Sequence, residues 1–164
     1  MRFRLVSRKL YPWVFLGAFA VFAFVPSIFP ALSIQHLIAV ATAIVAFIHF
    51  LYKQHTEETR LFHKLFTDFN RRYDKLNDGL NTILNVPEER MLSSDEKQIL
   101  YDYFNLCAEE YLFYTAGYID QTAWDAWRNG MKIYLRTEKV RLLLHEELRS
   151  NSYYGLSLEI IDTP

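Results

Sequence analysis

The most informative feature of the sequence is what one long part of it lacks. No Asp, Glu, Lys or Arg occurs from Leu10 to Tyr52, a run of 43 residues. One helix needs roughly 20 apolar residues to cross a bilayer, so the run has the length of two crossings. Pro26–Pro30 lies between them, and proline lacks the backbone donor that a continuous helix needs. We therefore predict a transmembrane hairpin over residues 10–52, with spans at about 10–29 and 32–52.

The chain also lacks the motifs of common enzymes. Its single cysteine, Cys107, excludes an intrachain disulfide and lies in an apolar stretch, as is typical of a small buried hydrophobic residue. There is no glycine-rich phosphate loop, His-Glu-x-x-His, paired Cys-x-x-Cys or Gly-x-Ser-x-Gly motif. We therefore expect no enzymatic activity, no catalytic residue, no metal or cofactor site, and no small-molecule substrate.

Two adjacent glutamates are the best candidates in the sequence for a carboxylate site. Glu109 and Glu110 point about 100° apart on a helix, so they do not form a shared carboxylate site by themselves. Two interpretations are open for these acids: each is solvated or ion-paired, or one is buried in its Tyr-rich helix. A deep polar pocket around them would indicate an unrecognised active site.

Charge is unevenly distributed along the chain. Residues 1–9 carry four bases and no acid, whereas residues 53–164 carry 14 bases and 19 acids, a net charge of −5. An acidic soluble part argues against general affinity for nucleic acid. Bases flank both outer ends of the predicted hairpin, and basic flanks favour the cytoplasm. We predict a multi-pass protein of the cell inner membrane, surrounded by membrane lipid, with both termini cytoplasmic. The rival interpretation is a secretory signal peptide cleaved near Ala31-Leu32-Ser33.

One face of the second predicted span is small and polar. Its members recur at spacings of 4, 3, 4 and 3, and they are Gln35, Ala39, Thr42, Ala46 and His49. Gln and His are costly in lipid unless partnered, so this polar stripe is expected to face protein or water. Close helix packing and the lining of a water path between several copies are both open interpretations.

Residues 53–86 are predicted to form one long amphipathic helix that continues the second span and ends before Pro87. Its apolar seam has heptad spacing and consists of Phe62, Phe66, Phe69, Tyr73, Leu76, Leu80 and Ile83. The seam either packs on its own domain or mediates self-association at the membrane, which would make the protein a homo-oligomer.

Residues 87–164 are predicted to form a cytoplasmic helical domain, which makes the fold class all-α. Ser93 and Glu96 have the spacing of a capping box at the start of a helix. Gly117 is a typical residue just past the end of that helix.

The rest of this domain has weaker signals. Asp120 is expected to cap a short helix that Gly130 is placed to interrupt, and Thr137 is expected to cap a last helix to about Arg149. Residues 156–161 are compatible with a short strand, although one strand needs a partner.

One group of basic residues is a candidate partner-binding surface. If residues 128–141 are helical, one face carries Arg128, Lys132, Arg136 and Lys139 at spacings of 4, 4 and 3. The basic stripe would meet an acidic partner, nucleic acid or anionic lipid, and the other interpretation is a solvated face. Gly130 and the Thr137 cap weaken the assumption of a single helix.

The layout of a basic start, a hairpin, a heptad helix and a terminal helical domain resembles small bacterial proteins with two transmembrane helices and a helical cytoplasmic tail. These include the two-span effectors of antiphage retron systems. Residues 69–77 and 103–111 also look like signature segments of an uncharacterised bacterial family, although no chemistry can be assigned to them.

This resemblance implies a toxin of the abortive-infection type. A cytoplasmic protein or nucleoprotein partner would hold the helical domain, and its release would let the spans cluster and permeabilise the membrane. The alternative from another class is a non-enzymatic, membrane-anchored scaffold that recruits a cytosolic partner.

Overall fold

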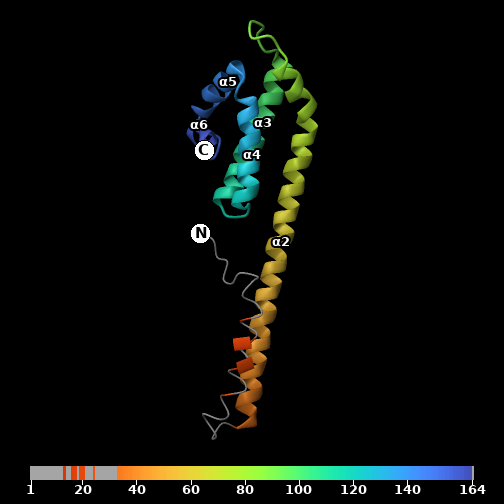
Figure 1. The fold of residues 1–164 in the computed structure, drawn as a ribbon, viewed down its shortest axis with the longest axis vertical. Coiled ribbons are helices and arrows are strands. Elements are labelled where there is room, and N and C mark those ends of the chain that lie inside the picture. The colour runs from red at the N-terminus through yellow and green to blue at the C-terminus, as the bar shows by residue number, and fades with distance from the viewer. Residues whose placement is uncertain (1–12, 14–15, 18, 21–23, 25–32, 164) are drawn as a thin grey trace. The chain divides into compact units, whose positions relative to one another are not determined.

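A computed structural model describes residues 13, 16–17, 19–20, 24 and 33–163 (Figure 1). Its elements are helices α2 (Ile34–Leu84), α3 (Ser94–Thr115), α4 (Gln121–Tyr134), α5 (Glu138–Leu148) and α6 (Leu158–Asp162). No strand occurs in this part of the chain, which confirms the all-α class for the residues described.

Most of the first predicted span lies outside the described residues, as do the basic N-terminus 1–9 and the turn at Pro26–Pro30. Of the helices described, one, α2, is long and apolar enough to cross a membrane by length and composition. The two-span hairpin therefore stays a prediction.

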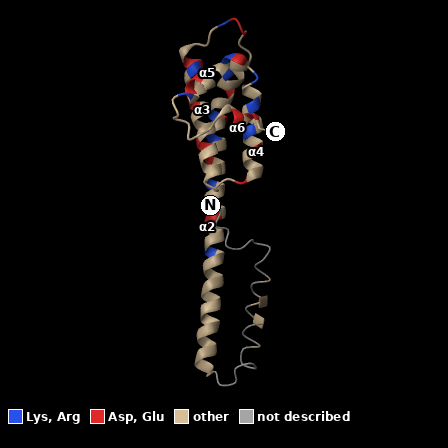
Figure 2. Ribbon diagram, turned by 90° about the vertical axis from the view of Figure 1, so that its left-hand side faces the viewer, with Lys and Arg blue, Asp and Glu red and all other residues tan. Residues whose placement is uncertain are grey.

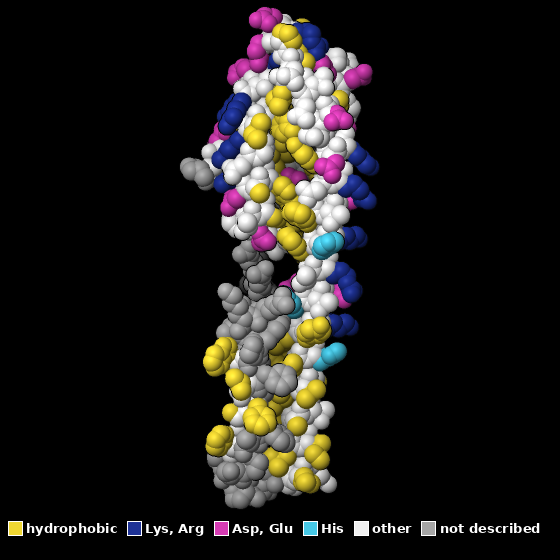
Figure 3. Space-filling model, turned by 45° about the vertical axis from the view of Figure 1, so that its right-hand side comes forward, with side chains coloured by type: hydrophobic (Ala, Val, Ile, Leu, Met, Phe, Trp, Pro, Cys, Tyr) yellow, Lys and Arg dark blue, Asp and Glu magenta, His cyan; other side chains and the backbone are white. Residues whose placement is uncertain are grey.

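The chain divides into two compact units, residues 2–60 and residues 61–164, and α2 contributes to both. In the first unit, only 6% of the most apolar 18-residue window of α2 is buried. Figure 2 shows this part of α2 without a charged residue, and hydrophobic side chains are exposed on it in Figure 3. A core helix of a soluble domain would bury most of such a window, whereas this segment is apolar and exposed and is long enough to span a membrane.

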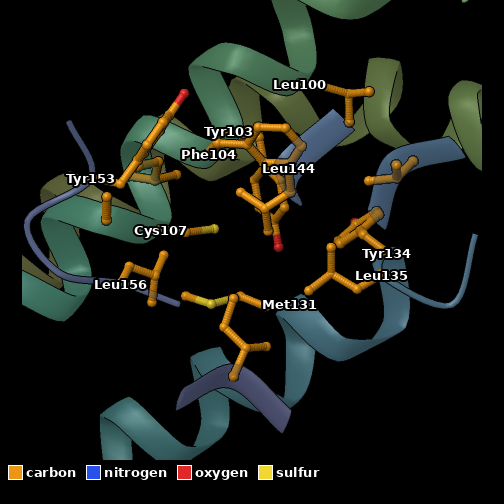
Figure 4. Packing of buried hydrophobic residues seen from close by; sticks show 14 of the residues in the cluster. Leu100, Tyr103, Phe104, Cys107, Met131, Tyr134, Leu135, Leu144, Tyr153 and Leu156 are labelled. Carbon is orange, nitrogen blue, oxygen red and sulfur yellow. The ribbon is translucent and has the colours of Figure 1, made fainter. Parts of the chain in front are cut away.

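In the second unit, α3 runs antiparallel to the last part of α2. Phe69 on α2 meets Phe113 near the end of α3, whereas Gly79 lies against Ile99 near its start. Helix α4 packs on α3, and α6 packs on α4. Figure 4 shows the centre of the resulting core, in which Leu100, Phe104 and Leu144 are almost fully buried.

Local signals explain where α3 begins and ends and where α4 begins. The Ser93 side chain accepts from the Glu96 amide while the Glu96 carboxylate accepts from the Ser93 amide, which confirms the capping box. Gly117 has a φ of 84°, the left-handed conformation that favours glycine just past a helix end. Asp120 caps α4 by accepting from the Ala123 amide at 2.9 Å.

Two expectations for the last third of the chain are wrong. Gly130 does not interrupt α4, which continues to Tyr134 because Trp124, Met131 and Tyr134 pack into the core along one side. Residues 156–161 form no strand; Ser157 caps the short helix α6 instead. Helix α5 does begin after Thr137, but the Thr137 side chain makes no capping hydrogen bond.

Candidate functional site

The polar stripe lies on the exposed surface of the apolar part of α2. Gln35, Ala39, Thr42, Ala46 and His49 are all exposed in the structure. The Thr42 hydroxyl donates to the Ile38 carbonyl of its own helix at 2.9 Å. Gln35 and His49 form no hydrogen bond with any of the described residues, so their polar groups are free to meet a neighbouring helix or water.

The heptad seam continues on the same helix and packs within the second unit. Leu80 and Ile83 are fully buried, and Phe69 is 2% exposed between Phe113 and Trp127. The partly buried members Phe62, Tyr73 and Leu76 pack against this core. The seam therefore anchors α2 firmly in its own helical domain.

The seam is least enclosed at its N-terminal end. Phe66 is 38% exposed, and its ring stacks on Trp127 with centroids 5.6 Å apart and on Phe62 at 5.8 Å. The first turns of the seam thus combine contact with α4 and a remaining apolar surface.

A charged pair joins α2 to α3 beside this seam. Arg72 donates to both carboxylate oxygens of Glu109, at 2.6 and 3.0 Å. The two side chains are 34% and 33% exposed, and the guanidinium also lies 5.9 Å from the centre of the Phe69 ring. A bidentate, half-buried pair fixes both the distance and the register of two helices better than a surface pair does.

Of the two adjacent acids, Glu110 is the buried one. The sequence alone left open whether either acid was buried. Glu110 is 6% exposed, and it accepts no hydrogen bond from the part of the chain that the structure describes. Burial raises the pKa of Glu110 to about 8; the nearby Arg72 charge acts in the opposite direction and the Glu109 charge adds to the rise. Glu110 is therefore mostly protonated at neutral pH, while Glu109 takes the ion pair.

Tyrosines connect three helices in the same region. The hydroxyl groups of Tyr73 on α2 and Tyr134 on α4 are hydrogen-bonded at 2.7 Å. Tyr103 on α3 packs edge-on against Tyr134, with ring centroids 5.1 Å apart. Cys107 points into this core (Figure 4), and burial raises the pKa of its thiol well above the ordinary value. A neutral, enclosed thiol is a packing group rather than a nucleophile.

The basic stripe does not lie on one helix. The chain turns at 135–137, so Arg128 and Lys132 lie on α4, Arg136 in the turn and Lys139 on α5. The single-helix assumption behind the stripe is thus wrong, because Tyr134 and Leu135 bury against the core and Thr137 starts a new helix.

Three of these bases also have intramolecular roles. Lys139 donates to the carbonyls of Val86, Pro87 and Arg90, at 2.6–3.3 Å, and so holds the connection that follows α2. Lys132 donates to the Thr163 carbonyl at 2.7 Å, and Arg128 pairs with Asp125. Arg136 is exposed. Three of the four basic side chains of the stripe therefore stabilise the fold.

The pairing of Arg72 with Glu109 could not be foreseen from the sequence. The two residues are 37 positions apart, and only the antiparallel packing of α3 on α2 brings them together. The available signal was local: Arg72 precedes Tyr73 of the seam, and Glu109 follows the apolar stretch Leu106–Ala108.

Within the described residues, no group of three or more His, Cys, Asp or Glu side chains could hold a metal ion. Comparison of the chain with protein-family models, with curated proteins and with solved structures gave no match.

Proposed function

We propose that this chain is a two-span effector of the cell inner membrane, with both termini in the cytoplasm. Its helical domain binds a regulatory protein or nucleoprotein partner. When that partner dissociates, the spans cluster and permeabilise the membrane. The resemblance to two-span effectors of antiphage systems supplies the biological setting. The proposal is non-enzymatic.

One observation carries the proposal: α2 is a single helix that contains both the apolar, exposed segment and the core of the helical domain. It extends over 51 residues, from Ile34 to Leu84. Phe69, Leu80 and Ile83 fix its second part in the domain, and the Arg72–Glu109 pair fixes its register against α3. A partner bound to the helical domain therefore also restrains the helix that carries the polar stripe.

The polar stripe supports clustering over simple anchoring. Exposed Gln35 and His49 are costly in lipid, and several copies can satisfy these groups with one another or with water. The exposed small residues Ala39 and Ala46 on the same face permit close approach of helices.

The test is expression of the chain alone in bacteria with a membrane-potential dye. We expect loss of potential and arrested growth. The triple variant Gln35→Leu, Thr42→Leu, His49→Leu should restore the potential while the protein stays in the membrane fraction. A wild-type chain that leaves the potential intact would contradict the proposal.

The second candidate is a membrane-anchored scaffold, favoured by the well-packed core and by the enclosure of Cys107 and Glu110. Replacing residues 10–52 by an unrelated hairpin separates the two functions. A scaffold keeps its activity after this exchange, whereas a membrane-permeabilising effector loses it.

A further inference from the structure

The C-terminal segment, residues 152–163, is held in the second unit by a few apolar anchors. Tyr153, Leu156 and Ile161 are buried, and Figure 4 shows Tyr153 and Leu156 in the same cluster as Met131 and Cys107. The helix in this segment, α6, has only five residues. So short a helix is unstable alone, so the segment keeps its shape through the surface that receives it.

Two bases hold the acidic end of this segment. Arg141 on α5 donates to both carboxylate oxygens of Asp162, and Lys132 on α4 donates to the Thr163 carbonyl at 2.7 Å. The receiving surface therefore combines apolar contacts for Leu156 and Ile161 with positive charge at the position of Asp162. This chemistry matches the C-terminal segment of any copy of the chain.

The connection to the segment is strained. Asn151 and Tyr154 have φ values of 55° and 52°, in the left-handed region, which asparagine adopts readily but which disfavours tyrosine. Gly155 follows with a φ of 81°. An extended connection would relieve Tyr154, and strained hinges of this kind favour the exchange of an identical element between copies.

We propose that the last part of the C-terminal segment is exchanged between two copies of this chain, each copy placing residues 156–163 on the α4–α5 surface of the other. The burial of Leu156 and Ile161 and the Arg141–Asp162 pair are then preserved, Tyr153 stays in its own copy, and the left-handed conformation of Tyr154 is relieved. Confinement of copies in one membrane raises their effective concentration and favours exchange. This last step rests on the proposed membrane location, but the exchange itself does not.

The test uses two full-length variants with different affinity tags, co-expressed and purified in detergent. Arg141→Asp places two acids together within one chain, and Asp162→Arg places two bases together. Only an exchanged pair made of one of each satisfies both surfaces. We expect the mixed pair to co-purify about five-fold more than two wild-type chains carrying the same tags, since each rejoined pair contributes a modest factor.

The control carries both substitutions, Arg141→Asp and Asp162→Arg, in one chain. It rejoins the ion pair within that chain, so its co-purification should return to the wild-type level. Tyr154→Gly should lower co-purification below wild type, because glycine removes the hinge strain.

Equal co-purification of all combinations would overturn the exchange, and it would still allow clustering through the spans. No co-purification of the mixed pair would also overturn it. Because each single variant changes only a half-exposed surface pair, an unchanged gel-filtration profile verifies that the domains are folded.

Discussion

At the scale of single residues, Glu110 is the buried charged side chain of the described part of the chain. The residue is 6% exposed, it accepts no hydrogen bond from the described residues, and burial raises its pKa from 4.5 to about 8. Between these two values the unfolded chain releases a proton that the folded domain retains. The contribution of Glu110 to stability is therefore fully present below about pH 4.5 and is lost as the pH rises through 8.

We expect Glu110→Gln to remove this loss. A shift from 4.5 to about 8 corresponds to an effect on the order of 5 kcal/mol at 1.36 kcal/mol per pH unit. The variant should match the wild type near pH 4.5 and be the more stable protein at pH 8. Denaturant unfolding in detergent, followed by the fluorescence of Trp124 and Trp127, measures both.

The control is Glu88→Gln, which removes one negative charge from an exposed position in the connection after α2. If Glu110→Gln and the wild type lose stability in parallel between pH 5 and 8, the buried carboxyl group is not the cause.

The sequence limited what could be predicted about these residues. Adjacent Glu109 and Glu110 had to face different directions, and that geometric argument holds: one is paired with Arg72 and the other is buried. The rotation of α3 against α2 determines which of the two acids pairs with Arg72 and which is buried. That rotation is set by contacts such as Phe69 with Phe113, which are distant in the sequence.

At the scale of elements, local chemistry was the reliable guide. The capping box of α3, the left-handed Gly117 and the Asp120 cap follow from side chains within a few residues of each helix end. The errors arose where packing outweighs local preference. Gly130 costs α4 about 1 kcal/mol relative to alanine, which the burial of Trp124 and Met131 readily offsets.

Gly130 and Gly79 form a matched pair for testing this view. A Cβ at Gly130 would meet nothing within 4 Å, so Gly130→Ala should raise the free energy of unfolding by about 0.5–1 kcal/mol. A Cβ at Gly79 would lie 2.8 Å from Ile99 Cδ1 and 3.3 Å from its Cγ2, so Ile99 must shift. Gly79→Ala should therefore gain clearly less than Gly130→Ala, or lose stability.

Denaturant titration of the two variants side by side measures this difference. An equal gain at both positions would mean that α2 and α3 are not in close contact at Gly79. The long α2 itself was predictable in outline, since an apolar run followed by a heptad seam without proline up to Pro87 favours one continuous helix.

At the scale of the whole molecule, the proposed function depends on the rigidity of α2. The helix contains the polar stripe at one end and the seam at the other, and the intervening residues 53–60 are polar and mostly exposed. An effector that responds to its partner needs a stiff connection at this point, whereas a scaffold needs only a tether.

Two insertions of seven residues between Thr59 and Arg60 separate these possibilities. An alanine-rich insertion adds about two helical turns and keeps the faces of α2 within about 20° of their original phase. A glycine-serine insertion of the same length breaks the helix and becomes flexible. Both leave the composition of the polar stripe and of the domain core unchanged.

We expect the alanine-rich variant to retain the membrane depolarisation of the wild type and its suppression by the partner. The glycine-serine variant should escape suppression, because a partner bound to the domain no longer restrains the spans. The measurement is the membrane-potential dye signal with and without the partner, in cells with equal amounts of each variant in the membrane fraction. Equal suppression of both variants would show that α2 acts as a tether, and it would favour the scaffold.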